Sequence, residues 1–175
     1  MSQAKEFLYS ENTNYQAVNL PYVGNRTSMV VVLPKNGKFQ EVISDMKNVY
    51  QDISQNLSSK GVALKMPKFE FTTGVYELSK HFIALGMVDA FDNGADFSGM
   101  TGDNDLMIKS ILHKAFIKVD ETGAEAAAAT AVVAKITFIG GPRDPIEMLI
   151  NRPFIFFIKD VESGQVLFMG VVKEI

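Results

Sequence analysis

The sequence predicts an α+β fold, mixed and mostly antiparallel in its β-structure, because segments with strand character outnumber those with helical character. Residues 15–23 and 27–34 are predicted to be two strands joined by Gly24-Asn25, a dipeptide that favours a tight hairpin turn. Residues 153–159 and 165–172 have the same strand character and predict a second hairpin towards the end of the chain. Adjacent strands joined by short turns pair antiparallel.

The first hairpin is followed by helical segments. Residues 30–33 are all apolar, which is expected of a strand buried on both faces of a sheet. The turn at residues 34–38, which contains proline and glycine, ends this strand. Two short helices are then predicted near residues 39–47 and 49–58.

The middle of the chain is predicted to alternate between extended and helical structure. Residues 62–71 are extended, with Pro67 interrupting the strand pattern. Residues 76–85 form a helix that ends at Gly86, because glycine accepts the backbone conformation found just beyond a helix. Residues 92–105 are rich in glycine and aspartate and form a loop.

The third quarter of the chain contains an unusual segment. Residues 106–119 are predicted to form a long strand. Residues 122–150 then contain two prolines and three glycines, without the pattern of one regular element. Long irregular segments are uncommon inside compact domains and are often functional. We therefore expect the function of the chain to lie in this segment.

The beginning of that segment is rich in alanine. Residues 119–133 pass from a charged strand end through one glycine into a run of small residues. With a period of two, Ala124, Ala126 and Ala128 share one face, whereas the charge of Glu125 lies on the other. Such a segment could slot into the middle of a sheet with little steric demand. The alternatives are a short alanine-rich helix and a passive linker.

The composition bounds the function. Hydrophobic residues make up 47% of the 175 residues, which suffices for a substantial core. The net charge of −3 is spread over the chain and does not favour nucleic acid or anionic membranes as partners. Cysteine is absent, which excludes disulfides and thiolate chemistry within these residues. Neither an apolar signal segment nor a run of membrane-spanning length is present.

Catalytic and metal-binding patterns are not recognisable either. His81 and His113 have no neighbouring nucleophile or suitably spaced carboxylate. We expect His81 to be a surface or packing residue, and His113 to be a core histidine. Five aspartates between residues 89 and 105 do not match the spacing of a calcium loop, so we expect no metal site. The sequence predicts no cofactor and no enzyme.

Several motifs, taken together, resemble the serpin superfamily. They follow the family's order and extend over almost the whole chain, and the most specific of them is at its end. The motifs are Leu20-Pro21-Tyr22, Asn25, residues 28–34, Met66-Pro67-Lys68-Phe69, residues 85–91, residues 95–99, Leu112-His113-Lys114-Ala115-Phe116, the alanine-rich run, residues 151–160 and residues 163–172.

The resemblance implies a serpin fold of which only the C-terminal half is present. Residues 1–175 would be the C-terminal portion of a single serpin domain, and residues 122–150 the reactive-centre loop with its distal connection. An N-terminal half, in the same or a companion chain, would supply most helices and several strands of the central sheet. Without it, we expect exposed strand edges and uncovered apolar surface. The family also implies an extracellular parent protein.

The function implied is inhibition of serine peptidases, and also of cysteine peptidases, by a suicide-substrate mechanism. The target cleaves the loop, and the freed hinge inserts into the central sheet. The hinge would comprise Glu121, Gly123, Ala124, Glu125, Ala126, Ala127, Ala128, Ala129 and Thr130. Ala124 departs from the inhibitory pattern, where a hydroxyl residue is usual.

Two further residues are implied to control opening of the sheet. His113 matches a histidine of the hydrogen-bond cluster beneath the central sheet, whose partners would lie in the N-terminal half. Lys68 matches a position from which it would pair with Glu121 near the entry of the loop. The alternative for Lys68 and Glu121 is two unrelated surface charges.

The position of the scissile bond can be predicted by counting residues from either end of the loop. The family's usual spacing from Glu121 places it between Thr137 and Phe138, whereas counting back from Asn151 favours the bond between Phe138 and Ile139. Phe138 before the cut suits a chymotrypsin-like target, and Thr137 an elastase-like one. Arg143 is a competing site that would imply a trypsin-like target.

Two other functions remain open. The parent could be a non-inhibitory serpin-fold binding or carrier protein, although the alanine-rich hinge argues against this. The chain could also be a truncated fragment that is inactive without its N-terminal half, because the sheet that accepts the hinge would be largely missing.

Overall fold

The computed structural model describes residues 1–120 and 144–174. The chain separates into two compact units, which are described in turn. The first unit is formed by Met1–Phe69 and Lys118–Ile175, and the second by Glu70–Ile117.

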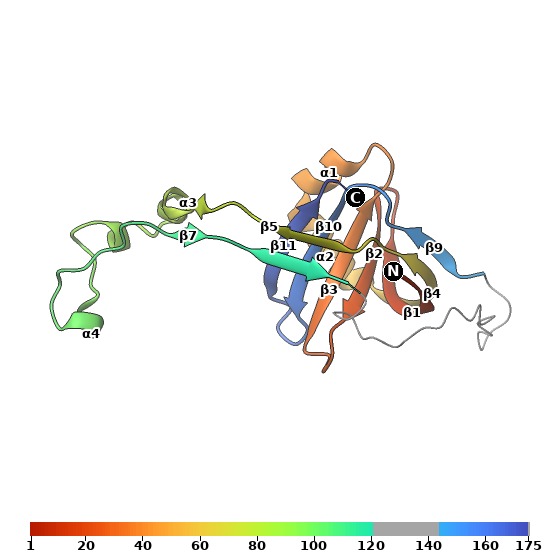
Figure 1. Cartoon of the computed structure of the whole chain (residues 1–175), viewed down its shortest axis with the longest axis horizontal. Coiled ribbons are helices and arrows are strands. Elements are labelled where there is room, and N and C mark those ends of the chain that lie inside the picture. Colours follow the sequence, from red (N-terminus) through yellow and green to blue (C-terminus); the bar gives the residue numbers. More distant parts are fainter. Residues whose placement is uncertain (121–143, 175) are drawn as a thin grey trace. The chain divides into compact units, whose positions relative to one another are not determined.

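The first unit is built on a seven-stranded sheet with the strand order β11-β10-β3-β2-β1-β4-β9 (Figure 1). All neighbouring strands are antiparallel except β4 and β9, which are parallel. The predicted mixed, mostly antiparallel sheet is therefore confirmed. The bounds are β1 Ser2–Glu11, β2 Tyr15–Pro21, β3 Thr27–Pro34, β4 Ser58–Lys65, β9 Ile146–Leu149, β10 Phe154–Asp160 and β11 Val166–Val172.

Both predicted hairpins are present. Strands β2 and β3 pair through Val18 and Val31, and Asn25 adopts a positive φ of 55° in their turn. Strands β10 and β11 pair through Phe156 and Gly170, and the turn between them contains Gly164 with φ 71°. The positive φ angles are the backbone conformations that asparagine and glycine tolerate best.

One face of the sheet is covered by two helices. Helix α1 spans Phe39–Ser44 and helix α2 spans Met46–Asn56, which confirms both predicted helices. Val49 and Ile53 of α2 are buried against the sheet, and the ring of Tyr50 lies edge-on to Phe157 at 5.1 Å. The core on this face consists of Tyr15, Ala17, Val30, Val32, Val42, Val49, Ile53, Ile155 and Phe157.

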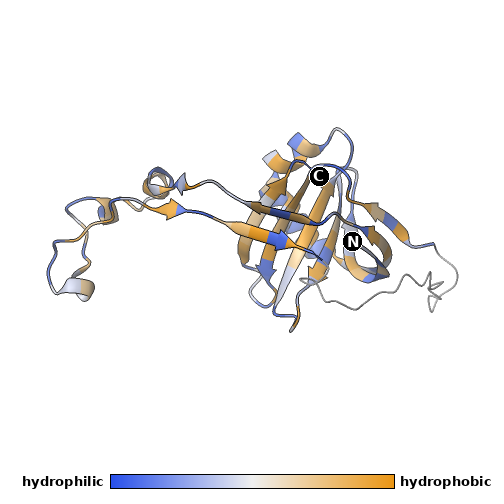
Figure 2. Cartoon of the chain, viewed as in Figure 1, coloured by the Kyte–Doolittle hydropathy of each residue, from blue (hydrophilic) through white to orange (hydrophobic). Residues whose placement is uncertain are grey.

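The opposite face of the sheet carries a second apolar layer. The ring of Phe69 lies 5.5 Å from that of Phe154 and 5.8 Å from that of Phe156. Because both faces are covered, the residues from Val30 to Leu33 are fully buried, as their uniform apolar character predicted. Figure 2 shows the apolar residues concentrated on the strands of this sheet.

Strand β1 was not predicted. Its residues 2–9 pair with β4 and its residues 8–11 pair with β2, so one long strand joins two parts of the sheet. Lys5, Glu6 and Ser10 interrupt the apolar pattern of this segment. Its strand structure therefore depends on pairing with distant neighbours rather than on local propensity.

The second unit corrects two sequence predictions. The helix expected at residues 76–85 is shorter, since α3 spans Ser79–Ala84 and β6, Tyr76–Glu77, pairs with β7, Leu112–His113. The carboxylate of Glu77 accepts a hydrogen bond at 2.9 Å from the N–H of Ser79, the first residue of the helix. Gly86, with φ 101°, follows the helix as predicted.

The prediction of a single strand at residues 106–119 was also wrong, because this segment contains two separate strands, β7 and β8. Strand β8, Phe116–Val119, forms a two-stranded sheet with β5, Phe69–Thr72. Between β7 and β8, Ala115 accepts a hydrogen bond from the Thr73 N–H at 2.8 Å and donates one to Thr73 Oγ1 at 2.9 Å. These bonds interrupt the strand. The predicted loop at 92–105 contains the single-turn helix α4, Ser98–Thr101, and the 3-10 turn η1, Asp89–Phe91, precedes it.

Candidate functional site

The segment that the sequence singles out lies largely outside the described residues. The hinge residues, from Glu121 to Thr130, and the candidates for the reactive bond, Thr137, Phe138 and Ile139, all belong to residues 121–143. The structure describes the strands that flank this segment, β8 before it and β9 after it. The site can therefore be built from its two anchors.

The upstream anchor is the end of β8. Val119 is buried, with 8% of its surface exposed, and fixes this end of the strand by packing. The carboxylate of Asp120 lies 3.7 Å from Lys118 Nζ. Only Asp120 thus separates the buried end of β8 from the predicted hinge.

The downstream anchor is strand β9, which lies within the predicted distal connection. Residues 146–149 pair in parallel with residues 62–65 of β4. Met148 is fully buried, Ile150 is 3% exposed, and the Ile150 N–H donates to the Lys65 carbonyl oxygen at 2.8 Å. Residues 146–150, at the end of the predicted distal connection, are therefore held on the large sheet.

A chain of polar contacts reinforces this anchor. Gln16 Nε2 donates to the Glu147 carbonyl oxygen at 3.3 Å and to Tyr9 Oη at 2.9 Å. Tyr9 Oη donates in turn to Glu11 Oε2 at 2.9 Å, and Lys35 Nζ lies 2.9 Å from Glu11 Oε1. These residues connect β9 to the centre of the sheet. Sequence reasoning missed this role of Gln16, because nothing in its local pattern indicates a contact with a strand so distant in the chain.

A polar hollow of about 420 Å³ lies beside this network. Its lining includes Tyr9 and Glu11 from β1, Asp52 from α2 and Ile146 from β9. The Asp52 carboxylate accepts hydrogen bonds from Tyr15 Oη and from Asn12 Nδ2, the latter at 3.0 Å. These hydrogen bonds connect helix α2 to strand β2 and to the turn before it.

The electrostatics of the network follow from burial and pairing. Burial raises the pKa of the Tyr9 phenol, and burial together with the neighbouring Asp52 carboxylate raises the pKa of Tyr15. The hydrogen bond from Lys35 lowers the pKa of the Glu11 carboxyl. Both phenols are therefore neutral donors over the physiological range, and Glu11 is an anionic acceptor.

The Glu11 pair predicts a small loss of stability in acid. A carboxyl whose pKa is lowered on folding stabilises the folded state above its unfolded pKa of about 4.3, and this contribution is lost as the pH falls through the lower folded value. We expect about 0.2–1 kcal/mol, because more than a third of the Glu11 side chain is exposed. Urea unfolding of wild type and Glu11→Gln as a function of pH measures the difference. If Lys35→Gln leaves the difference intact, the lysine is not its cause.

The turn after β9 is held by an arginine. Arg152 Nε donates to the Pro34 carbonyl oxygen at 2.9 Å, which ties the start of β10 to the end of β3. Arg152 belongs to the motif that carries the family resemblance, but the motif alone does not indicate this contact. This hydrogen bond between a guanidinium and a carbonyl oxygen holds residues 151–153 where the chain enters the buried strand β10.

The two residues assigned to sheet opening belong to other elements than the anchors. His113 is exposed in β7, so its expected place in a core is wrong for the described residues. Lys68 is exposed between β4 and β5, and its proposed partner Glu121 lies outside the described residues. The roles of His113 and Lys68 in opening the sheet stay predictions. His81 is exposed in α3, as expected.

Two general properties complete the description. Within residues 1–120 and 144–174, no three side chains of the His, Cys, Asp or Glu type come together as metal ligands would. The helices in this part of the chain are also too short or too polar to cross a lipid bilayer.

The whole chain, residues 1–175, matches the family model described as Serpin (serine protease inhibitor). The protein therefore belongs to the serpin family. An uncharacterized serpin-like protein of Thermococcus kodakarensis is 41% identical over 171 residues, which cover 97% of this chain and 40% of the relative. Intracellular coagulation inhibitor 2 of Tachypleus tridentatus is 36% identical over 172 residues, with 97% and 41% covered.

A solved structure shows the same fold. Human thyroxine-binding globulin in complex with thyroxine has a TM-score of 0.77 and 27% identity, covering 98% of this chain and 45% of the globulin. The serpin fold predicted from the sequence is thereby confirmed. The chain spans less than half the length of each of these relatives.

Proposed function

We propose that the parent protein inhibits serine peptidases as a suicide substrate, with residues 122–150 as its reactive-centre loop and distal connection. The observation that carries the proposal is the run from Gly123 to Ala129, in which every residue except Glu125 is small and which lies in the sequence between the buried end of β8 and the anchored strand β9. Small side chains minimise the steric cost of insertion between two existing strands. The family of the chain supports inhibition of peptidases as the general activity.

The chemistry belongs to the target enzyme. Its nucleophilic serine attacks one carbonyl carbon in the loop and forms an acyl-enzyme, while the amine of the downstream fragment leaves. The hinge then enters the central sheet and releases free energy stored in the metastable fold. The acylated peptidase is carried with the hinge, its active site is distorted, and hydrolysis of the ester stalls. Cysteine peptidases form an analogous thioester and are a second class of target.

The two anchors determine which arm of the cleaved loop can insert into the sheet. A cut near residues 137–139 separates an upstream arm attached to β8 from a downstream arm attached to β9. The downstream arm keeps its pairing with β4 and the burial of Met148. Only the upstream arm is then free to insert, and it is the arm that carries the acyl bond.

We also propose that residues 1–175 are the C-terminal portion of one serpin domain and that an N-terminal half accompanies them. Strand β11 is at an edge of the large sheet, and Leu167, Phe168 and Met169 are between 47% and 63% exposed. Apolar edges of this kind are normally covered in a folded protein. The missing half would cover this edge and complete the sheet that accepts the hinge.

The carrier function is the second candidate. The thyroxine-bound globulin with the same fold is the observation that favours it. A carrier does not need a hinge of small residues, so the alanine run argues for the inhibitor. The third candidate, an inactive fragment, applies to residues 1–175 in isolation and is compatible with an inhibitory parent.

The remaining features of the proposal follow from the mechanism. The protein has no catalytic residues and no cofactor, and its partners are the target peptidase and the N-terminal half rather than nucleic acid or a membrane. An extracellular parent protein suits secreted peptidases as targets. The relative named as an intracellular inhibitor shows that the family is not confined to that compartment.

The test is reaction of the full-length parent with chymotrypsin-like, elastase-like and trypsin-like peptidases. We expect a covalent complex that survives denaturant, and release of a peptide that begins at Phe138 or Ile139. Mass spectrometry identifies the peptide. Cleavage without a complex would support the carrier, and a peptide beginning at Asp144 would move the reactive bond to Arg143. Residues 1–175 alone, reacted in parallel, test whether the fragment is inactive.

A further inference from the structure

The chain contains two asparagines that are followed by glycine, Asn36 and Asn93. Both asparagines are exposed. An asparagine in this position can lose its amide when the main-chain nitrogen of the next residue attacks the side-chain Cγ. Glycine favours the attack, because it has no side chain to hinder the approach. The two sites differ in what surrounds the attacking nitrogen.

We propose that Asn36 is a site of spontaneous deamidation in the folded protein, whereas Asn93 is protected by the carboxylate of Asp92. The Gly37 nitrogen loses its proton and forms a bond to Asn36 Cγ, and the side-chain nitrogen leaves as ammonia. Water then opens the resulting succinimide at either carbonyl, which yields aspartate or isoaspartate. Water is the co-reactant, and no oxidant or reductant is needed.

The attacking nitrogen is accessible at Asn36. Residues 35–38 form a turn closed by a hydrogen bond from the Lys38 N–H to the Lys35 carbonyl oxygen at 2.9 Å. Gly37 has φ 77° at the third position, which is typical of a type II turn. Within the described residues, the Gly37 N–H donates to no acceptor. Nothing in this part of the structure therefore holds its proton in place.

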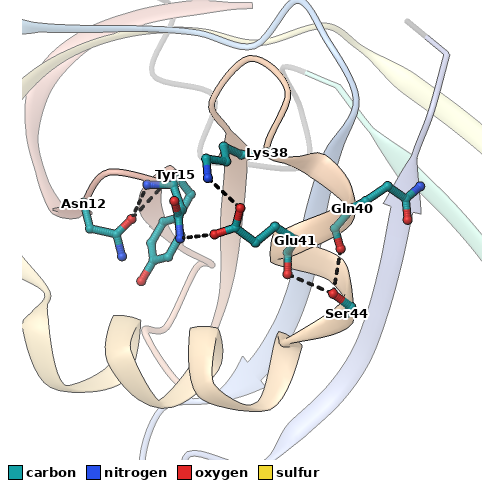
Figure 3. Close-up of polar contacts among 7 residues, drawn as sticks. Asn12, Tyr15, Lys38, Gln40, Glu41 and Ser44 are labelled. Atoms are coloured by element: carbon teal, nitrogen blue, oxygen red, sulfur yellow. Dashed lines mark hydrogen bonds and ion pairs between the residues drawn. The ribbon is translucent and has the colours of Figure 1, made fainter.

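The charges around this turn are paired with one another. Lys35 pairs with Glu11 at 2.9 Å, and Lys38 pairs with Glu41 at 2.6 Å, as Figure 3 shows for the second pair. Both carboxylates are thus engaged by lysines, and neither accepts a hydrogen bond from the Gly37 N–H within the described residues.

The attacking nitrogen at Asn93 is held by an anion. The Gly94 N–H donates to Asp92 Oδ1 at 2.6 Å, a short hydrogen bond to a charged acceptor. Removing this proton would break the bond and place a second negative charge beside the carboxylate. Deamidation at Asn93 is therefore predicted to be slower than deamidation at Asn36.

The test is incubation of the native full-length parent at mildly alkaline pH, followed by peptide mapping with mass spectrometry. Both sites are quantified as aspartate plus isoaspartate in the same digest. We expect conversion at Asn36 to exceed that at Asn93 by about tenfold or more, which corresponds to about 1.4 kcal/mol in the barrier. Equal rates at the two sites in the native protein would overturn the proposal.

Two variants separate charge from hydrogen bonding. Asp92→Ala removes both and is expected to bring Asn93 close to the rate of Asn36. Asp92→Asn keeps an acceptor oxygen without the charge and is expected to give an intermediate rate. Circular dichroism checks that both variants are folded, and in urea the two sites should react at similar rates. If a folded Asp92→Ala leaves Asn93 unchanged, the carboxylate does not protect it.

Discussion

Replacing Ala126 by Arg in the full-length parent is expected to convert an inhibitor into a substrate. With a period of two, Ala126 shares a face with Ala124 and Ala128, and we propose that this face turns under the sheet on insertion. A guanidinium there would be buried without a partner, at a cost of several kcal/mol. The target would still cleave the loop, because the bond it attacks lies further along the chain. Insertion would be too slow to trap the acyl-enzyme.

The measurement is the ratio of inhibitor consumed to peptidase inactivated, with the covalent complex followed on denaturing gels. Ala128→Arg should behave like Ala126→Arg, since both lie on the same face. Glu125→Arg is the matched control, because a charge already occupies that position on the other face and the variant should still inhibit. Arg variants at both alanines that trap the peptidase at the wild-type ratio would show that this face does not turn inwards.

Replacing Gly170 by Ala is expected to destabilise the large sheet by about 1–3 kcal/mol. Gly170 pairs directly with Phe156, and a Cβ atom at Gly170 would lie 2.5 Å from Phe156 Cζ and 2.7 Å from Cε1. The ring cannot move away easily, because Phe156 is 97% buried and packs against Phe69 at 5.8 Å. Urea denaturation of the parent protein measures the loss.

A double-mutant cycle tests the cause. Phe156→Leu alone should cost stability through lost packing, but in the Gly170→Ala background it should cost less, because the smaller side chain removes the collision. Gly74→Ala is the control, since a Cβ there meets nothing within 4 Å, and its effect should stay within about 0.5 kcal/mol. Strict additivity of the two sheet substitutions would exclude the collision with Phe156.

Local signals predicted the elements that are stabilised locally. The hairpin around Gly24-Asn25 has a turn sequence that adopts one geometry, and the apolar run at residues 30–33 is buried on both sides as its composition requires. Strand β1 and the division of residues 106–119 depend on partners far away in the chain. Local propensity predicts a helix at Tyr76, because it does not include the pairing of Tyr76 with the distant His113.

The candidate site divides in the same way. The hinge and the bracket for the reactive bond follow from residue size and from family motifs, and they remain predictions. The anchoring of the distal connection could not be predicted, because Met148 becomes a buried anchor only through the parallel pairing with β4. The hydrogen bond from Gln16 to the Glu147 carbonyl oxygen could not be predicted either, because its acceptor is a backbone atom and does not depend on the identity of the side chain.

The register of β3 has a consequence for biosynthesis. Val32 pairs on one side with Ala17, which is synthesised just before it, and on the other side with Ile155, which is synthesised much later. Strand β3 therefore lacks its second neighbour until the residues between β3 and β10 have been synthesised. Contacts so distant in sequence slow folding, and an unpaired apolar edge favours aggregation in the meantime. The speed of translation between β3 and β10 should thus influence the yield of folded protein.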